Sequence, residues 1–290
     1  MRVAATADPH VGKGYSVRIA GSLKSHVSIH SHCTMFKNLV QSVFKKLGFE
    51  VRRTFDSSSK MPVELTPEEC DIIRHVFSHK LTLVSPERLW TTLMACKHAI
   101  EHKIEGDFVE CGVWRGGNAM VAAEMFKLYG VSKKIWLFDT YKGMTAPTDV
   151  DVSIADGLAA RNKYVSKKRG THNEWCYASL DDVKNNFDQR DLLSENVVFV
   201  EGDVCQTLKD RRHVPTNICV LRLDTDWYES TKVELEVLYP RLTVGGSLII
   251  DDYGHWSGAK KATDEYFAIH GNRPFLQYTD YTGRISVKVS

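Results

Sequence analysis

Short apolar runs and segments with helical spacing alternate along most of the chain. Apolar runs typical of buried strands occur at residues 107–111, 134–138, 196–201, 218–223 and 246–251. Helical segments separate most of these runs, at residues 117–129, 179–187 and 229–241. Strands interleaved with helices are typical of a doubly wound, mostly parallel sheet with helices on both faces. The pattern therefore predicts an α/β protein with a Rossmann-like fold.

Two helix starts precede the first of these strands. Thr66 is followed by Pro67 and two glutamates, which offers a capping hydroxyl, a proline at the first helical position and an acid at the third. Ser85 is followed by Pro86, Glu87 and Arg88, and this second start predicts a helix through residue 99. Residues 61–290 are therefore expected to form the main folded domain.

The first sixty residues differ in charge and pattern from the rest. They carry ten Lys and Arg residues and three acids, a net charge of +7, while the whole chain carries only +2. Residues 1–34 show no sustained period, and residues 35–47 combine apolar residues at helical spacing with lysines. We predict a basic N-terminal extension, residues 1–60, with an amphipathic helix at 35–47. Packing of this helix on its own domain or on a second subunit is favoured over a peripheral membrane contact.

Composition excludes several classes of protein. Hydrophobic residues make up 43% of the chain, as in ordinary globular proteins, and no window resembles a membrane span or a secretory signal. The seven cysteines never form a CxxC pair, which indicates reduced thiols and a cytoplasmic protein. Basic residues concentrate in the extension and around residues 161–169, without an aromatic stacking platform, so a nucleic-acid partner is not expected.

A glycine-rich loop follows the first predicted strand. Glycines allow a tight strand-to-helix turn and a close approach of a ligand to the backbone. The loop has Trp114 where a dinucleotide site would need its middle glycine, and an acid precedes the glycines. An acid suits the ammonium group of S-adenosylmethionine better than a pyrophosphate. The candidate cofactor residues of this loop are Glu110, Gly112, Val113, Trp114, Arg115, Gly116 and Gly117.

The next two strand ends add polar groups to the same edge of the sheet. Asp139 and Thr140 end the second strand, where an acid can accept hydrogen bonds from ribose hydroxyls. Asp203 follows the third strand and could border the adenine. Asp139 could instead cap a helix or lie in a solvated turn, and Asp203 could instead belong to an ordinary turn.

Two pairs of acids follow the fourth and fifth strands: Asp224 and Asp226, then Asp251 and Asp252. Adjacent parallel strands would bring these four carboxylates to one rim, where they would strongly raise one another's pKa unless a cation lay among them. Oxygen ligands without a nearby cysteine favour Mg²⁺, Mn²⁺ or Ca²⁺ over zinc. The alternative is that these acids cap the helices that follow.

The motifs FVECGVWRGG, FDTYKGM, EGDV, LRLDTDWYEST and GGSLIIDDYGHWSGAKKATDEYF, in this order and spacing, resemble the macrocin O-methyltransferase family over residues 64–288. The resemblance implies a class I methyltransferase fold, the cofactor S-adenosylmethionine, Mg²⁺ and a homo-oligomer. It also implies metal ligation by Asp224, Asp251 and Asp252 and a general base at Asp226. The segment 142–178 matches the family's mobile lid over the acceptor.

The resemblance further implies that the acceptor is a hydroxyl of a sugar on a glycan or a glycosylated natural product. The lid is polar and basic, so we expect an acceptor unlike a hydrophobic macrolide. His255 is the second candidate for the base, because it follows the acids of the fifth strand. Two alternatives are a metal-dependent O-methyltransferase of an aromatic diol and a non-catalytic scaffold on the same fold. The intact set of acids argues against the scaffold.

Overall fold

The structure is a computed structural model that describes residues 16–18, 50–52, 61–210, 212, 214–271 and 273–290. The chain divides into two compact units, Met1–Thr66 and Pro67–Ser290. In the first unit, β1 (Ser16–Arg18) pairs antiparallel with β2 (Glu50–Arg52). The helix predicted at residues 35–47 lies outside the described residues.

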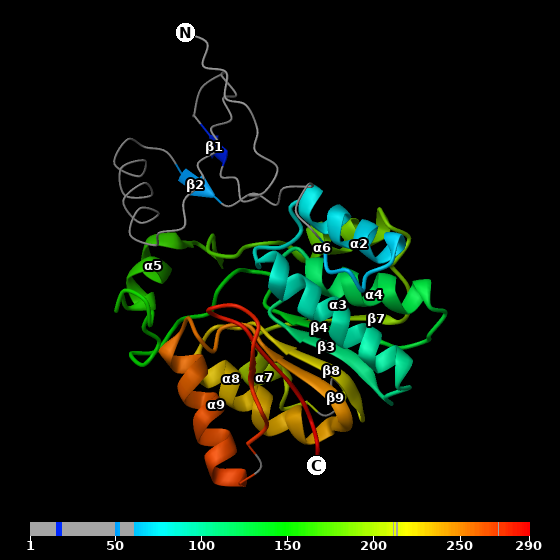
Figure 1. The fold of residues 1–290 in the computed structure, drawn as a ribbon. Helices are drawn as coiled ribbons and strands as arrows, with labels where there is room; N and C mark the ends of the chain where they lie inside the picture. Colours follow the sequence, from blue (N-terminus) through cyan, green and yellow to red (C-terminus); the bar gives the residue numbers. More distant parts are fainter. Residues whose placement is uncertain (1–15, 19–49, 53–60, 211, 213, 272) are drawn as a thin grey trace, which may run out of the picture. The chain divides into compact units, whose positions relative to one another are not determined.

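A seven-stranded sheet forms the centre of the second unit (Figure 1). Its strands lie in the order β10-β11-β9-β8-β3-β4-β7. The five strands from β9 to β7 are parallel, and β11 pairs antiparallel with both β9 and β10. The strands are β3 (Asp107–Cys111), β4 (Ile135–Asp139), β7 (Val197–Glu201), β8 (Ile218–Leu223), β9 (Leu242–Ile250), β10 (Gln277–Tyr278) and β11 (Arg284–Val287).

Helices cover both faces of this sheet, which confirms the predicted doubly wound α/β fold (Figure 1). One layer holds α2 (Pro67–Ser78), α3 (Pro86–Glu101), α4 (Gly117–Leu128) and α6 (Leu180–Asp188). The other holds α7 (Val204–Thr207), α8 (Tyr228–Val237) and α9 (Ser257–His270). None of the described helices is both long and apolar enough to cross a membrane.

Local sequence explains where several elements begin and end. Ser85 Oγ accepts a hydrogen bond from the Arg88 amide at 3.2 Å, so the predicted cap starts α3. The helix predicted at 229–241 ends earlier, at Val237, and a 3₁₀ turn (Tyr239–Arg241) follows, because Pro240 lacks the amide that would continue an α-helix. Strand β9 begins four residues earlier than predicted, because a register shift against β8 carries the strand through its two glycines.

Alternation along β3 and β8 sends apolar and charged side chains to opposite faces. Val109, Leu221 and Leu223 belong to the core cluster that also contains side chains of α8 and α9. Because successive side chains of a strand point to opposite faces, Glu110 and Arg222 project toward the other layer. These two residues are cross-strand partners in the β3–β8 register, so the fold places a charged pair inside the sheet, next to the ends that carry the site.

The predicted lid, residues 142–178, contains α5 (Ala160–Lys167) and the small hairpin of β5 (Lys168–Arg169) and β6 (His172–Asn173). Its first part is joined to the starts of α8 and α9. The buried carboxylate of Asp151 accepts hydrogen bonds from the Thr148 amide at 2.7 Å and from the Tyr228 amide at 2.9 Å. The Ile154 amide donates to the carbonyl of His255 at 2.8 Å. These contacts hold the lid over the carboxyl ends of the strands.

Candidate active site

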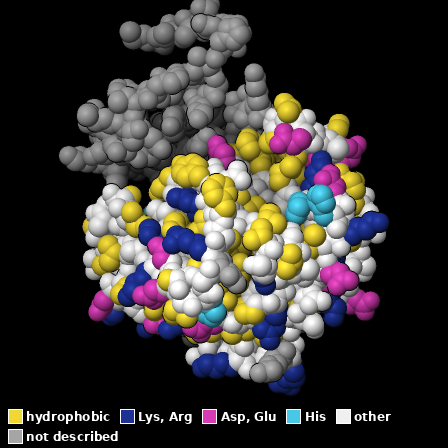
Figure 2. Space-filling view, turned by 60° about the horizontal axis from the view of Figure 1, so that its bottom comes forward, with side chains coloured by type: hydrophobic (Ala, Val, Ile, Leu, Met, Phe, Trp, Pro, Cys, Tyr) yellow, Lys and Arg dark blue, Asp and Glu magenta, His cyan; other side chains and the backbone are white. Residues whose placement is uncertain are grey.

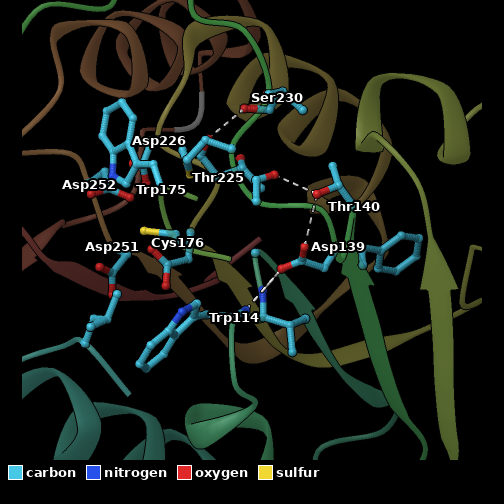
Figure 3. Close-up of a pocket in the computed structure, with 18 of the residues that line it drawn as sticks. Trp114, Asp139, Thr140, Trp175, Cys176, Thr225, Asp226, Ser230, Asp251 and Asp252 are labelled. Atoms are coloured by element: carbon cyan, nitrogen blue, oxygen red, sulfur yellow. Dashed lines mark hydrogen bonds between the residues drawn. The ribbon is translucent and has the colours of Figure 1, made fainter. Parts of the chain in front are cut away.

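A pocket lies at the carboxyl ends of β3, β4, β8 and β9, and the lid forms one of its walls (Figure 3). Strand β3 lies in the middle of the parallel part of the sheet. The chain adds β4 and β7 on one side of β3 and then crosses over to add β8 and β9 on the other side. Open α/β sheets bind ligands at such a reversal of strand order. The pocket is therefore where the fold is expected to hold a ligand.

The glycine loop forms the floor of this pocket next to β8. Gly112 has φ +86°, and a Cβ at this position would collide with the carbonyl oxygen of Asp224. A side chain would therefore separate the ends of β3 and β8. Trp114, in the same loop, also has a positive φ, +48°. Gly112, Val113, Trp114 and Gly117 line the pocket as predicted for cofactor residues, and their contact with a cofactor stays a prediction.

Asp139 fixes the conformation of this loop. Its Oδ2 accepts hydrogen bonds from the amides of Trp114 at 3.1 Å (Figure 3) and Val113 at 2.7 Å. Its Oδ1 accepts one from the Tyr141 amide at 2.7 Å. Burial raises the pKa of this carboxyl group, while the amides lower it. Asp139 lines the pocket, so the geometry leaves its oxygens close to any ligand bound there.

The other predicted residues at the ends of β4 and β7 also line the pocket. Thr140 donates its hydroxyl to the carbonyl of Gly143 at 2.7 Å, which closes the first turn of the lid. Asp203 accepts a hydrogen bond from the Cys205 amide at 2.9 Å and caps the short helix α7. Asp203 therefore caps a helix, where the sequence suggested an ordinary turn as the alternative, and it also lines the pocket.

Three residues predicted to bind the cofactor lie outside the pocket lining. Glu110 is fully buried and accepts a hydrogen bond from Nη1 of Arg222 at 2.8 Å, while its other oxygen has no hydrogen-bond partner among the residues that the structure describes. Burial raises the pKa of Glu110 to about 7. Arg115 points away and pairs with Asp182 on α6 at 2.9 Å. Gly116, at φ +88°, precedes α4 beneath the loop. Their contact with the cofactor stays a prediction, since none of the three lines the pocket.

The acids after β8 and β9 divide into two groups. Asp224, Asp226 and Asp252 can each present one carboxylate oxygen so that all three atoms lie within 4.8 Å of one another. Oδ2 of Asp252 is buried and has no hydrogen-bond partner among the described residues. Burial, together with the neighbouring carboxylates, raises the pKa of Asp226 to about 7 and raises those of Asp224 and Asp252 well above the usual range. We call these three side chains the carboxylate group.

Asp251 forms the second group with two arginines. One of its oxygens accepts from Arg222 and the other accepts from Arg88 of α3. Arg222 also donates to Asp224 at 2.6 Å, and Arg88 lies 3.1 Å from Asp280. The two guanidinium groups therefore neutralise Asp251 and support one edge of the carboxylate group, because buried carboxylates need such partners.

The carboxylate group fits a hard divalent cation. It offers three oxygens from two adjacent strand ends, and one of these residues carries a buried oxygen without a partner. Carboxylate oxygens are the ligands that Mg²⁺ and Mn²⁺ prefer. The predicted ligands Asp224 and Asp252 belong to this group, and so does the predicted base Asp226. A cation at the predicted ligand Asp251 would share that carboxylate with its two arginines.

The lid contributes an aromatic wall. The ring centroid of Trp175 lies 5.4 Å from that of Trp227 and 5.9 Å from that of Trp256, and all three tryptophans are buried. Cys176, next to Trp175, turns into the pocket beside the acids (Figure 3). His255 also lines the pocket; its Nδ1 lies 2.7 Å from the hydroxyl of Tyr281, and burial lowers its pKa.

The predicted set lacked several residues of this site. Arg222 had a recognisable signal, since a charged residue within the apolar run ICVLRL must find a buried partner. The others come from α3 or from the lid, where spacing along the chain does not show which side chains reach the pocket. The most informative of them are Arg88, Lys163, Trp175 and Cys176, which line the pocket, and Arg222, which pairs with its acids.

The sequence matches the Macrocin-O-methyltransferase (TylF) family over residues 34–286. The match begins thirty residues before residue 64, where we expected the resemblance to start, and it takes in residues 35–47, which we expected to lie outside the family. A demethyldecarbamoylnovobiocin O-methyltransferase from Streptomyces niveus is 35% identical over 192 residues, 64% of this chain and 68% of the relative. A tetracenomycin-C 4'-O-methyltransferase from Streptomyces olivaceus is 31% identical over 204 residues, 70% of this chain and 73% of the relative.

Solved structures agree with these sequence matches. The structure of the O-methyltransferase NovP superimposes with a TM-score of 0.63 at 32% identity, covering 72% of this chain and 83% of that one. The calicheamicin methyltransferase CalS11, at 18% identity and a TM-score of 0.53, shares the fold. The chain therefore belongs to the macrocin O-methyltransferase family and is an O-methyltransferase with the class I fold.

Proposed function

We propose that this methyltransferase transfers a methyl group from S-adenosylmethionine to a sugar hydroxyl and needs Mg²⁺ to do so. The observation that carries the proposal is the carboxylate group, which shares one pocket with the glycine loop and Asp139. The names of the relatives support the sugar. One acts at the 4'-oxygen of a rhamnosyl-tetracenomycin, and a second, at 32% identity, acts at the 3''-oxygen of mycinamicin III.

The glycine loop and the ends of β4 and β7 would hold the methyl donor. Gly112 and Gly117 let the loop pack closely against the backbone of Asp224 and Leu81, and both line the pocket where the methionine part would lie. Asp139 would accept from the ribose hydroxyls, and Asp203 would border the adenine. When bound, S-adenosylmethionine supplies an electrophilic methyl group. The chain contributes chiefly by fixing the loop through Asp139, so that donor and acceptor meet in one orientation.

Asp224 and Asp252 would hold the divalent cation, with Asp226 beside it. When bound, the cation lowers the pKa of an acceptor hydroxyl and orients its oxygen. Asp226 would accept the hydroxyl proton at a carboxylate oxygen. Its backbone has φ +69°, and such strained conformations cluster at functional sites, where the surroundings hold them. His255 remains the second candidate for the base, since it lines the same pocket.

Methyl transfer to a panel of glycosides, followed as release of S-adenosylhomocysteine with and without Mg²⁺, tests the proposal. We expect Asp226→Asn to lose at least about a hundredfold in turnover, as expected for a general base, while still binding S-adenosylmethionine. A variant that keeps its turnover would exclude Asp226 as the base. The matched variant His255→Asn would then become the decisive one.

The metal assignment has its own test. The resemblance implies Asp251 as a ligand, whereas the geometry groups Asp226 with Asp224 and Asp252. Titration of Mn²⁺ into Asp226→Asn and Asp251→Asn separates the two possibilities. We expect the larger loss of Mn²⁺ affinity in the variant whose carboxylate binds the cation. Equal affinities in both variants and the wild type would exclude both residues as ligands.

We also propose a cytoplasmic, homo-oligomeric enzyme. The six cysteines that the structure describes are all free thiols, which suits a reducing compartment. The subunit number is tested by light scattering of the full chain. A monomer at micromolar concentration would contradict the proposed assembly.

A further inference from the structure

The basic side chains of the lid differ in how they are neutralised. Arg161 lies 3.2 Å from Asp149, and both side chains are exposed. Lys167 and Arg169 share the carboxylate of Glu174, at 4.0 Å and 3.1 Å. These pairs belong to the solvated surface of the lid. On the face shown in Figure 2, acidic and basic side chains are likewise mixed, without a broad basic field.

Lys163 is different, because it is the lid cation that lines the pocket. Its Nζ lies 4.0 Å from the centroid of the Trp175 ring. Among the described residues, no carboxylate lies within 4.0 Å of this ammonium group and no acceptor takes a hydrogen bond from it. An ammonium group carries three donors, so all three remain for water or for a ligand in the pocket.

The indole under this ammonium group is held firmly. Trp175 is 7% exposed, and its amide donates to Oδ1 of Asn173 at 2.9 Å. Its ring packs against Trp227 and Trp256, and the Trp227 indole donates to the carbonyl of Thr145 at 3.1 Å. A cation over the face of a fixed indole is attracted by the ring, so Lys163 is restrained before any ligand binds. Such restraint reduces the entropy lost on binding.

Charge decides which ligand suits this arrangement. A neutral hydroxyl would accept a hydrogen bond from Lys163 without pairing with its charge, whereas a phosphate or carboxylate would do both. We propose that Lys163, fixed over Trp175, binds an anionic group, phosphate or carboxylate, that the acceptor sugar carries. The inference rests on the proposed function, because it places the acceptor between this subsite and the carboxylate group.

Binding of three matched sugars tests the inference. Methyl glucoside is neutral, glucuronate carries a carboxylate, and glucose 1-phosphate carries a phosphate. Each is titrated by calorimetry into the full chain saturated with S-adenosylhomocysteine and Mg²⁺. We expect at least one anionic sugar to bind about tenfold tighter than the neutral one, which corresponds to one charge-assisted hydrogen bond. Its identity separates phosphate from carboxylate.

Two variants assign the preference to one side chain. Lys163→Met should lose the tenfold preference, because the anionic sugars lose more affinity than methyl glucoside does. Lys168→Met is the matched control, because this exposed lysine of β5 does not line the pocket, and it should keep the preference. Equal affinities for the three sugars, no binding of either anionic sugar, or a preference that survives in Lys163→Met would each overturn the inference.

The same titrations separate this inference from the proposed function. If wild type does not bind S-adenosylhomocysteine, the proposed function fails with it. If S-adenosylhomocysteine and Mg²⁺ bind and the anionic sugars show no advantage, only the anionic subsite is excluded.

Discussion

Removal of the Arg222 guanidinium should destabilise the apo protein more than any exposed ion pair could. Arg222 is fully buried and donates to Glu110 at 2.8 Å, to Asp224 at 2.6 Å and to Asp251. In Arg222→Met the aliphatic stem is roughly preserved, so the change mainly deletes the charge. Glu110 would then have no hydrogen-bond partner in the described part of the chain, since its other oxygen has none there in the wild type. Breaking one buried ion pair costs about 3–5 kcal/mol, so we expect a loss of at least about 3 kcal/mol.

The loss should depend on pH. Burial raises the pKa of Glu110 to about 7 even with Arg222 present. Without the guanidinium, this pKa must rise further above the unfolded value of about 4.3. A raised folded pKa gives a contribution to stability that is present below the unfolded pKa and lost as pH rises through the folded pKa. The difference between wild type and variant should therefore grow from pH 5 to pH 8.

Urea unfolding of the metal-free chain at pH 5 and pH 8 measures both effects. Arg161→Met is the control, because its ion pair with Asp149 is exposed and should contribute under about 1 kcal/mol. A loss for Arg222→Met below about 1 kcal/mol at pH 8, or one that does not change with pH, would refute the argument that this cation compensates the buried carboxylates.

Three further changes test other parts of the account. Gly112→Ala should lower the free energy of unfolding by about 3 kcal/mol or more, because the added Cβ would collide with the Asp224 backbone. Its control is Gly130→Ala, at φ +65° with nothing within 4 Å of the added Cβ, which should lose only the backbone strain of about 1–2 kcal/mol. Similar losses for the two variants in urea unfolding would contradict the collision. Burial raises the pKa of Glu234 to about 8, so the stability that this group contributes is lost as pH rises from about 4.3 through 8. In Glu234→Gln the free energy of unfolding should no longer fall by about 1.4 kcal/mol per pH unit over this range. If wild type and variant show parallel curves of unfolding free energy against pH, Glu234 does not hold a buried proton. Asp252→Asn should raise the melting temperature of the metal-free chain, because it relieves repulsion between carboxylates, and it should abolish the stabilisation by Mg²⁺. If Mg²⁺ raises the melting temperature of the variant as much as that of the wild type, Asp252 is not a metal ligand.

Much of the site could be predicted because its residues follow buried strands directly. An apolar run ending in Asp139, Asp224 or Asp252 shows both the strand and the end where its acid lies, and parallel strands bring such ends together. The fold class followed from the same runs, since their alternation with helical segments is strong and regular.

The sequence could not show the orientation of each acid. Successive side chains near a strand end point to opposite sides, so Asp251 and Asp252 reach different partners although they are neighbours in the chain. Glu110 turns away from the pocket for the same reason, while its cross-strand partner Arg222 lies beside it. Lys163 was predicted only as part of a basic lid, because only tertiary packing brings its ammonium group over Trp175.

Calorimetric titration of S-adenosylmethionine and Mg²⁺ into the wild type and Asp224→Asn tests the central claim most directly. Asp224 belongs to the carboxylate group and not to the loop expected to hold the cofactor. We predict that the wild type binds both ligands and that Asp224→Asn binds S-adenosylmethionine but loses Mg²⁺. A wild type that binds no S-adenosylmethionine, or a variant that binds Mg²⁺ as tightly as the wild type, would contradict a methyl-donor pocket with a metal site at its carboxylate group.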